Sequence, residues 1–158
     1  MDITVVVEIP KGSRNKYEMD HHTERIKLDR VLYSSVHYPA DYGFIEHTLG
    51  GDGDPLDALV LIAEPTFPGC LIDCHPIGVF LMHDEKGDDE KVLCVPEADP
   101  QWSHVRELDE VPPHLLLEIE HFFQTYKHLE DKPTATFGWQ DKTAADRVIT
   151  EALERYGQ

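Results

Sequence analysis

Positive charge is scarce in this sequence. Its 14 Lys and Arg residues are outnumbered by 31 Asp and Glu residues, which gives a formal net charge of -17. Proteins that bind nucleic acid or anionic membranes use Lys and Arg to neutralise phosphate or lipid charge. The composition therefore argues against both kinds of partner, and metal ions are the expected counter-charge.

Long hydrophobic runs are absent as well. No segment reaches the ~18 consecutive apolar residues that a membrane span requires. The N-terminal residues Met1-Asp2-Ile3 lack the basic and apolar regions of a signal peptide. We therefore expect a cytoplasmic protein.

Cysteine is rare, and the three cysteines are Cys70, Cys74 and Cys94. Three cysteines cannot all pair, and their spacing matches no zinc site, so we expect buried free thiols without redox chemistry. Repeats, low-complexity tracts and linkers are also missing, and 158 residues fit one compact unit. We expect a single domain over residues 1–158.

Carboxylates are abundant, and three of them fall close together in the stretch 50–57, at Asp52, Asp54 and Asp57. Aspartates at this spacing repel one another at neutral pH, so a chain that gathers them requires a compensating positive charge. Mg²⁺ supplies it, since it prefers oxygen ligands. A solvated acidic turn is the alternative, because Asp-Gly and Asp-Pro pairs mark turns in general. An EF-hand is excluded, because the residue types that its loop requires at the fifth, sixth and twelfth positions are missing.

A second acidic segment lies at residues 84–91. A site for several metal ions requires more carboxylates than one loop can direct inward. Alone, such a charge run is more often a solvated turn. Two acidic, glycine-containing loops beside the strands of one small domain favour convergence on a common site.

The first hundred residues carry strand signals. We expect strands at 3–9, 31–38, 42–48, 57–62 and 91–95, and a hairpin of 16–20 with 25–29. The apolar run 70–82 contains Pro76 and Gly78, which predicts a strand that bends around a barrel or curved sheet. Residues 83–90 are expected to form the second acidic loop.

The C-terminal third has a helical period instead. Apolar residues between Leu115 and Tyr126 recur on one helical face, and Pro112 and Pro113 suit the first turn. A second helix is predicted from about Thr143. The expected fold class is α+β: a small closed or strongly curved antiparallel β-barrel, OB-like, with two C-terminal helices packed on it.

Short motifs along almost the whole chain carry a resemblance. In order they are Glu8-Ile9-Pro10, Lys16-Tyr17-Glu18, Asp29-Arg30, Tyr38-Pro39 with Asp41-Tyr42-Gly43, Asp52-Gly53-Asp54-Pro55-Leu56-Asp57, Asp84-Glu85 with Asp89 and Lys91, and Tyr126-Lys127. The chain resembles the bacterial-type soluble inorganic pyrophosphatases of family I. The resemblance implies hydrolysis of pyrophosphate to two orthophosphates, with several Mg²⁺ ions per active site and Mn²⁺ or Zn²⁺ as possible substitutes. It also implies a homohexamer.

The resemblance assigns roles to individual residues. A metal-activated water attacks phosphorus in line without a covalent intermediate, and Asp54 accepts its proton, with Asp89 as the second candidate. The implied metal ligands are Glu8, Asp52, Asp57, Asp84 and Asp89. The implied phosphate ligands are Lys16, Arg30, Tyr42, Lys91, Tyr126 and Lys127. Glu18 and Tyr38 are expected to orient the cations.

Taken one by one, these residues have ordinary explanations. Lys16 and Lys91 could be edge-strand lysines, Arg30 could form a surface ion pair, and Tyr126 could be a core residue of its helix. A noncatalytic calcium-binding module is an alternative function, although it has no use for cations aimed at its acidic loops. A phosphomonoesterase with a nucleophilic Asp52 would place that residue at the end of an apolar strand, whereas glycines precede it here.

The sequence contains 10 histidines. The neighbours His21 and His22 could bind a transition metal, but lone surface histidines are far commoner. A zinc hydrolase would be expected to show a pattern such as His-Glu-x-x-His, which is absent. The histidines therefore receive no predicted role.

Overall fold

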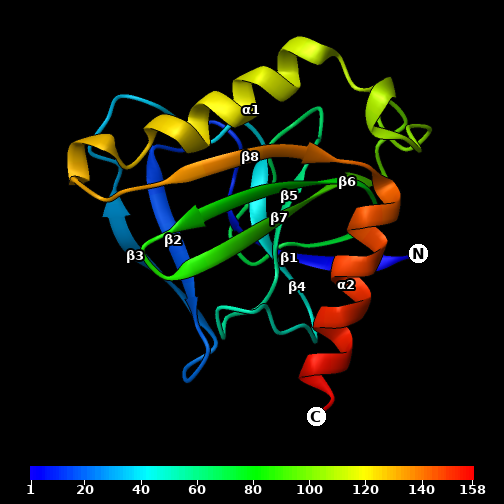
Figure 1. Cartoon of the computed structure of the whole chain (residues 1–158), viewed down its shortest axis with the longest axis horizontal. Helices are drawn as coiled ribbons and strands as arrows, with labels where there is room; N and C mark the ends of the chain where they lie inside the picture. Colours follow the sequence, from blue (N-terminus) through cyan, green and yellow to red (C-terminus); the bar gives the residue numbers. More distant parts are fainter.

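The computed structural model describes residues 1–158 (Figure 1). The strands are β1 (Ile3–Ile9), β2 (Asn15–Asp20), β3 (Arg25–Val31), β4 (Asp41–Ile45), β5 (Asp57–Val60), β6 (Leu71–Asp84), β7 (Gly87–Pro96) and β8 (Ala135–Gln140). The helices are α1 (Pro113–Thr125), α2 (Lys142–Tyr156) and the short 3-10 turns η1 (Leu108–Glu110) and η2 (His128–Glu130). No helix is long and apolar enough to cross a membrane.

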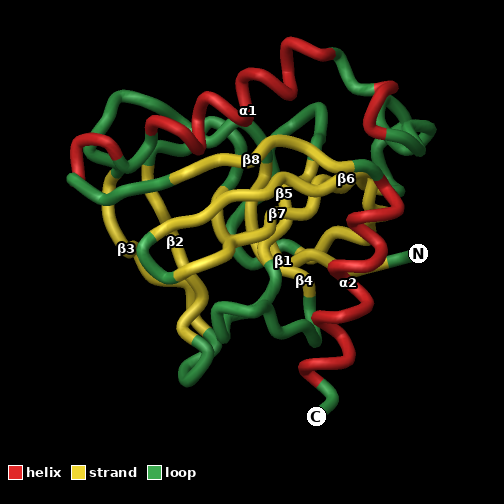
Figure 2. The backbone as a smooth tube through the Cα atoms, viewed as in Figure 1, coloured by secondary structure: helices red, strands yellow, loops and turns green.

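Five strands form a closed ring. The sheet order is β1-β4-β5-β7-β6-β8, and β1 also pairs with β6, which closes the ring and leaves β8 as an added outer strand. All pairings in this sheet are antiparallel except that of β5 with β7, which is parallel. The predicted small closed sheet is confirmed, with one parallel pair in place of a fully antiparallel order. Strands β2 and β3 form a separate hairpin beside the ring (Figure 2).

Two apolar clusters cover the two faces of the ring. Side chains alternate along β5 and the residue after it, so that Ala58 and Val60 join the cluster beneath α2, whereas Leu59 and Leu61 join the cluster beneath α1. This two-sided burial explains why β5 reads as a continuous apolar run. In Figure 1, α1 lies along β8 and α2 stands on the side of the molecule opposite the β2–β3 hairpin. The two predicted C-terminal helices are confirmed.

Two predictions about elements are wrong, and one strand was missed. Strand β3 ends at Val31, and the expected strand 31–38 is an irregular segment that places Leu32 and Tyr38 in the core, so its apolar composition reflects burial and not sheet pairing. The second acidic segment is not a long loop, because β6 and β7 continue to a tight turn at which Asp84 pairs with Gly87. Strand β8 was not predicted; it is a short strand at the end of the sheet order that contains Gly138 and leaves Phe137 exposed.

Gly43 lets β4 approach β1 closely. A Cβ atom at Gly43 would lie 1.8 Å from the carbonyl oxygen of Val6. Only glycine fits such an approach of two backbones. This contact places Tyr42, the residue before Gly43, against the end of β1 that carries Glu8, since Tyr42 pairs with Ile9.

Candidate active site

A cavity of about 590 Å³ opens between the ring, the β2–β3 hairpin and the turn that joins β6 to β7. Its walls include thirteen of the fourteen residues with predicted roles: Glu8, Lys16, Glu18, Arg30, Tyr42, Asp52, Asp54, Asp57, Asp84, Asp89, Lys91, Tyr126 and Lys127. These side chains come from the seven strands β1 to β7, one loop and the segment that directly follows α1. Residues that are more than a hundred positions apart in the sequence therefore share one polar cavity.

The remaining residue, Tyr38, lies behind the cavity wall. Its side chain is buried, and its ring centroid lies 5.4 Å from that of Tyr42 and 4.7 Å from that of Phe122. It lines a different groove on the far side of these rings. Any effect of Tyr38 on the cations must therefore pass through the packing of Tyr42 and Phe122.

Loop 50–57 holds its aspartates through backbone hydrogen bonds. The Gly50 N–H donates to the Asp54 carbonyl at 2.6 Å, and the Asp54 N–H donates to Asp52 Oδ1 at 3.1 Å. Gly53 takes a φ of 89°, which favours glycine. The turn leaves the Asp54 carboxylate exposed, whereas Asp57 enters β5.

Lys91 is the buried centre of the cavity. Its side chain is 2% exposed, and its Nζ lies 2.9 Å from Asp89 Oδ2 and 3.1 Å from Asp57 Oδ2. It also donates to Tyr42 Oη at 2.6 Å, and the Tyr42 hydroxyl in turn donates to Asp57 Oδ2 at 2.7 Å. The parallel pairing of β5 with β7 sets Asp57 opposite Lys91, and Asp89 lies two residues earlier on the same face of β7.

The neighbouring groups of this cluster fix the protonation states of Lys91 and Tyr42. Burial alone would lower the pKa of Lys91, but Asp89 and then Tyr42 and Asp57 outweigh it and hold the pKa well above its ordinary value. Burial raises the pKa of the Tyr42 hydroxyl, and the neighbouring Asp57 raises it further. Lys91 therefore stays a cation, and Tyr42 stays a neutral hydrogen-bond donor.

Carboxylates of the cavity outweigh their cationic partners. Burial raises the pKa of Glu8 to about 7, against a lowering by the Met19 N–H, which donates to Glu8 Oε2 at 2.7 Å. Burial also raises the pKa values of Asp52 and Asp89, which lie near further carboxylates. Raised pKa values mean that the ionised carboxylates are unfavourable here unless a positive charge lies nearby.

This oxygen-rich donor set suits hard divalent cations such as Mg²⁺. The ligands are not preassembled, however, because no three His, Cys, Asp or Glu side chains stand close enough together to enclose an ion. Lys91 lies between Asp57 and Asp89 instead. The residues therefore fit metal ions in their chemistry, with Lys91 as the cation already in place.

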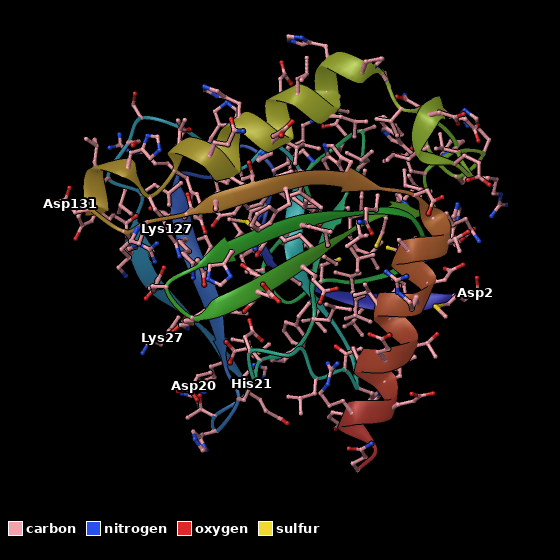
Figure 3. All side chains as sticks on the ribbon, in the orientation of Figure 1. Asp2, Asp20, His21, Lys27, Lys127 and Asp131 are labelled. Atoms are coloured by element: carbon pink, nitrogen blue, oxygen red, sulfur yellow. The ribbon has the colours of Figure 1, made fainter.

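The turn between β6 and β7 reaches two walls of the cavity. Lys127 Nζ lies 3.6 Å from Asp84 Oδ2 and 3.4 Å from Glu85 Oε1, and Lys86 Nζ lies 3.9 Å from Asp54 Oδ2. Figure 3 shows Lys127 at the end of the molecule where α1 has ended, on the side of the β2–β3 hairpin.

The β2–β3 hairpin supplies two further cations. Lys16 and Arg30 are register partners across the hairpin, so both side chains point to the same face. Asp29 Oδ2 lies 3.4 Å from Lys16 Nζ and 2.5 Å from Arg30 Nη1. Burial alone would raise the pKa of Asp29, but Lys16 and Arg30 reverse this effect and lower it. Glu18 lies 3.7 Å from Lys16 Nζ.

Several cavity residues received no role from the sequence. Asp29 and Glu85 are part of the recognised motifs, so a signal was present for both. Lys86, Lys132 and His21 line the cavity without such a signal. His21 packs edge to face on Phe44 at 5.4 Å, at the tip of the β2–β3 hairpin (Figure 3).

A cavity that combines clustered carboxylates with ammonium, guanidinium and phenol groups is typical of enzymes that act on polyanions together with metal ions. The family model described as inorganic pyrophosphatase matches residues 5–157. The chain belongs to the inorganic pyrophosphatase family. The predicted family and the predicted enzyme class, a hydrolase of diphosphate, are confirmed.

Individual relatives agree with this assignment. The chain is 57% identical to an inorganic pyrophosphatase of Methanosarcina mazei over 96% of this chain and 90% of the relative. It is 55% identical to one from Streptomyces coelicolor, over 99% and 96% of the two chains.

Solved structures are similar as well. An inorganic pyrophosphatase from Helicobacter pylori superimposes with a TM-score of 0.97 at 42% identity, covering 99% of this chain and 94% of that chain. A truncated vacuolar soluble pyrophosphatase from Trypanosoma cruzi, solved in complex with PPi, gives a TM-score of 0.86 at 25% identity, covering 99% and 69%.

Glu8 provides a testable pH dependence. Its pKa in the folded protein, about 7, lies above the ordinary value of 4.5, so the folded state binds this proton more tightly than the unfolded chain does. In EDTA, the resulting stability should be fully present below pH 4.5 and lost as the pH rises through about 7. The loss should be on the order of 3 kcal/mol at most. Urea unfolding across this pH range measures it.

Glu8→Gln cannot ionise and should flatten this part of the pH profile. Glu154→Gln, an exposed position on α2, is the matched control and should keep the slope of the parent protein. A Glu8→Gln profile as steep as that of the parent protein would assign the pH dependence to another group.

Proposed function

We propose that this cavity binds pyrophosphate together with divalent metal ions and hydrolyses it to two orthophosphates. The observation that carries the proposal is that one cavity gathers the acidic loop, the buried Lys91 cluster and the cations of the β2–β3 hairpin. Membership of the pyrophosphatase family and the PPi complex of the Trypanosoma cruzi relative support it. Phosphoryl transfer depends mainly on positioning and on neutralising charge, which such a cavity provides.

The residues proposed to hold Mg²⁺ are all carboxylates: Asp52, Asp57 and Asp89 for the first ion, with Asp57 shared by a second, and Asp84 and Glu8 for further ions. Mn²⁺ and Zn²⁺ are possible substitutes. Bound divalent ions supply a water of lowered pKa and neutralise charge on phosphoryl oxygens. Asp89 and Asp57 already bind the Lys91 ammonium group, which holds both carboxylates in place before any further cation arrives.

Six side chains are proposed to bind and orient the phosphates: Lys16, Arg30, Tyr42, Lys91, Tyr126 and Lys127. Tyr126 is a suitable neutral donor because burial raises the pKa of its hydroxyl, even against the lowering effect of Lys91 and Lys127. Burial alone would lower the pKa of Lys127, but Tyr126, Glu85 and Asp84 raise it, so this residue remains a cation. Fixed donors of this kind hold phosphorus in line with the attacking water.

Asp54 is proposed as the general base. The turn leaves its carboxylate exposed to the cavity, and Lys86, at 3.9 Å, is its ion-pair partner. It can therefore take the proton from the water as the new P–O bond forms and the bridging P–O bond breaks. Asp89 is the second candidate, but its carboxylate is buried and occupied by Lys91.

We further propose a cytoplasmic homohexamer with residues 1–158 as one domain. Nucleotide-polymerising reactions, which release pyrophosphate, supply the substrate in that compartment. Large apolar side chains such as Leu117, Leu129 and Phe137 are 59%, 64% and 66% exposed, and small domains commonly bury such groups by symmetric association. Light scattering at micromolar concentration should give six times the 18.1 kDa chain mass. The mass of a single chain would contradict the proposal.

The assay that tests the function is phosphate release from pyrophosphate with Mg²⁺. We expect rapid turnover of pyrophosphate and little phosphate release from p-nitrophenyl phosphate, because the proposed site binds both phosphates of a diphosphate. A calcium-binding module would act on neither compound, and a phosphomonoesterase would prefer p-nitrophenyl phosphate. Absence of pyrophosphate turnover would overturn the proposed function.

Two variants separate the roles of Asp54 and Asp89. Asp54→Asn should keep metal affinity and lower kcat by on the order of 10², the size expected for loss of a general base. Asp89→Asn should first weaken metal binding, so part of its rate should return at high Mg²⁺. Measuring kcat against Mg²⁺ for both variants tests the assignment. Rescue of Asp54→Asn by Mg²⁺, together with no rescue of Asp89→Asn, would mean that the roles are reversed.

A further inference from the structure

Arg30 is held by two carboxylates that reach it from different elements. Asp29, its neighbour on β3, lies 2.5 Å from Nη1. Glu130, the last residue of η2, places Oε1 2.8 Å from Nε. Burial alone would lower the pKa of Arg30, but Glu130 and Asp29 reverse this effect. Two carboxylates therefore lie against the guanidinium group, one beside Nη1 and one beside Nε.

Glu130 is an unusual carboxylate for this acidic surface. Its side chain is only 3% exposed, although most carboxylates of an acidic protein face water. Its second oxygen, Oε2, is buried and makes no hydrogen bond within the protein. The same holds for Arg30 Nε and Nη2, so the contact of Nε with Glu130 Oε1 is a close ion pair without hydrogen-bond geometry. A buried carboxylate with an unused oxygen is costly, which points to a role other than stability.

Arg30 nevertheless reaches the cavity, since its side chain is 20% exposed and is part of the cavity wall. Its Nη1 donates to Asp29 Oδ2, and its Nε lies beside Glu130 Oε1. A guanidinium group binds phosphate oxygens best when its plane is held in advance, because less rotational freedom is lost on binding.

Glu130 also joins two parts of the cavity wall. It lies three residues after Lys127, in the connection from α1 to β8 that also carries Lys132, whereas Arg30 belongs to the β2–β3 hairpin. The hairpin pairs with no strand of the ring. The ion pair between Glu130 and Arg30 thus links the hairpin cations to the Lys127 side of the cavity.

We propose that Glu130 is a positioning residue for substrate binding, which orients the Arg30 guanidinium toward a phosphate of pyrophosphate and fixes the hairpin against the end of α1. The inference rests on the proposed function, because Arg30 is a phosphate ligand only if pyrophosphate binds in this cavity. Glu130 itself does not touch the substrate.

The test is the effect of Glu130→Gln on pyrophosphate hydrolysis at saturating Mg²⁺. The neutral amide keeps the shape of the side chain but loses the charge that holds Arg30. KM should rise about tenfold with kcat changed less than about threefold, as expected for loss of binding that is shared by substrate and transition state. Glu130→Asp keeps the charge on a shorter side chain, and its KM should lie between those of the parent protein and Glu130→Gln.

Asp131→Asn is the matched control. It removes the same charge one residue further on, at an exposed position with a φ of 54° that Asn tolerates, and Figure 3 shows Asp131 at the outer end of the connection. Its KM should equal that of the parent protein. The thermal midpoint of each variant separates an effect on binding from an effect on folding.

A double variant tests whether Glu130 acts through Arg30. Arg30→Ala should raise KM, and adding Glu130→Gln to it should raise KM no further. An unchanged KM in Glu130→Gln, or a further independent rise in the double variant, would overturn the inference. Inactivity of the parent protein on pyrophosphate would instead overturn the proposed function, so the two failures are distinguishable.

Discussion

The buried ammonium group of Lys91 is the constraint on which the cavity depends. A buried charge is strongly destabilising unless its partners are held in good geometry. Asp57, Asp89 and the Tyr42 hydroxyl are therefore all held in contact with Lys91 Nζ. The parallel pairing of β5 with β7 is what places these groups, since it sets Asp57 directly opposite Lys91. The departure from a fully antiparallel sheet is thus the feature that builds the centre of the site.

Around this centre the cavity has more carboxylate than cation. Burial raises the pKa values of Glu8, Asp52 and Asp89, and neighbouring carboxylates raise them further. The same physical situation increases the affinity of the cavity for any cation, whether a proton or a divalent metal. An overall charge of -17 would repel a polyanionic substrate, so the local cations and the proposed metal ions must reverse the sign of the field inside the cavity.

The cations come from parts of the chain that only packing holds together. Arg30 stands on a hairpin outside the ring, and Lys127 follows α1. Glu130, three residues after Lys127, forms an ion pair with Arg30. Glu85, in the turn between β6 and β7, forms an ion pair with Lys127. Behind them, Tyr38 and Phe122 form an aromatic layer against Tyr42 and Tyr126. The positions of the cavity side chains therefore depend on this network of ion pairs and packed aromatic rings.

The sequence by itself determined the family, the helices with their 3.6-residue period, most strands, and the residue types of the site, because these are properties of local pattern and of motifs. It did not determine that Lys91 is buried, that Tyr38 lies behind the cavity, that residues 31–38 are irregular, or that Glu130 holds Arg30. Only the tertiary structure decided these points. Burial, strand register and ion pairing depend on which distant segments meet, and that depends on the free energy of the whole packed chain and not on any local stretch.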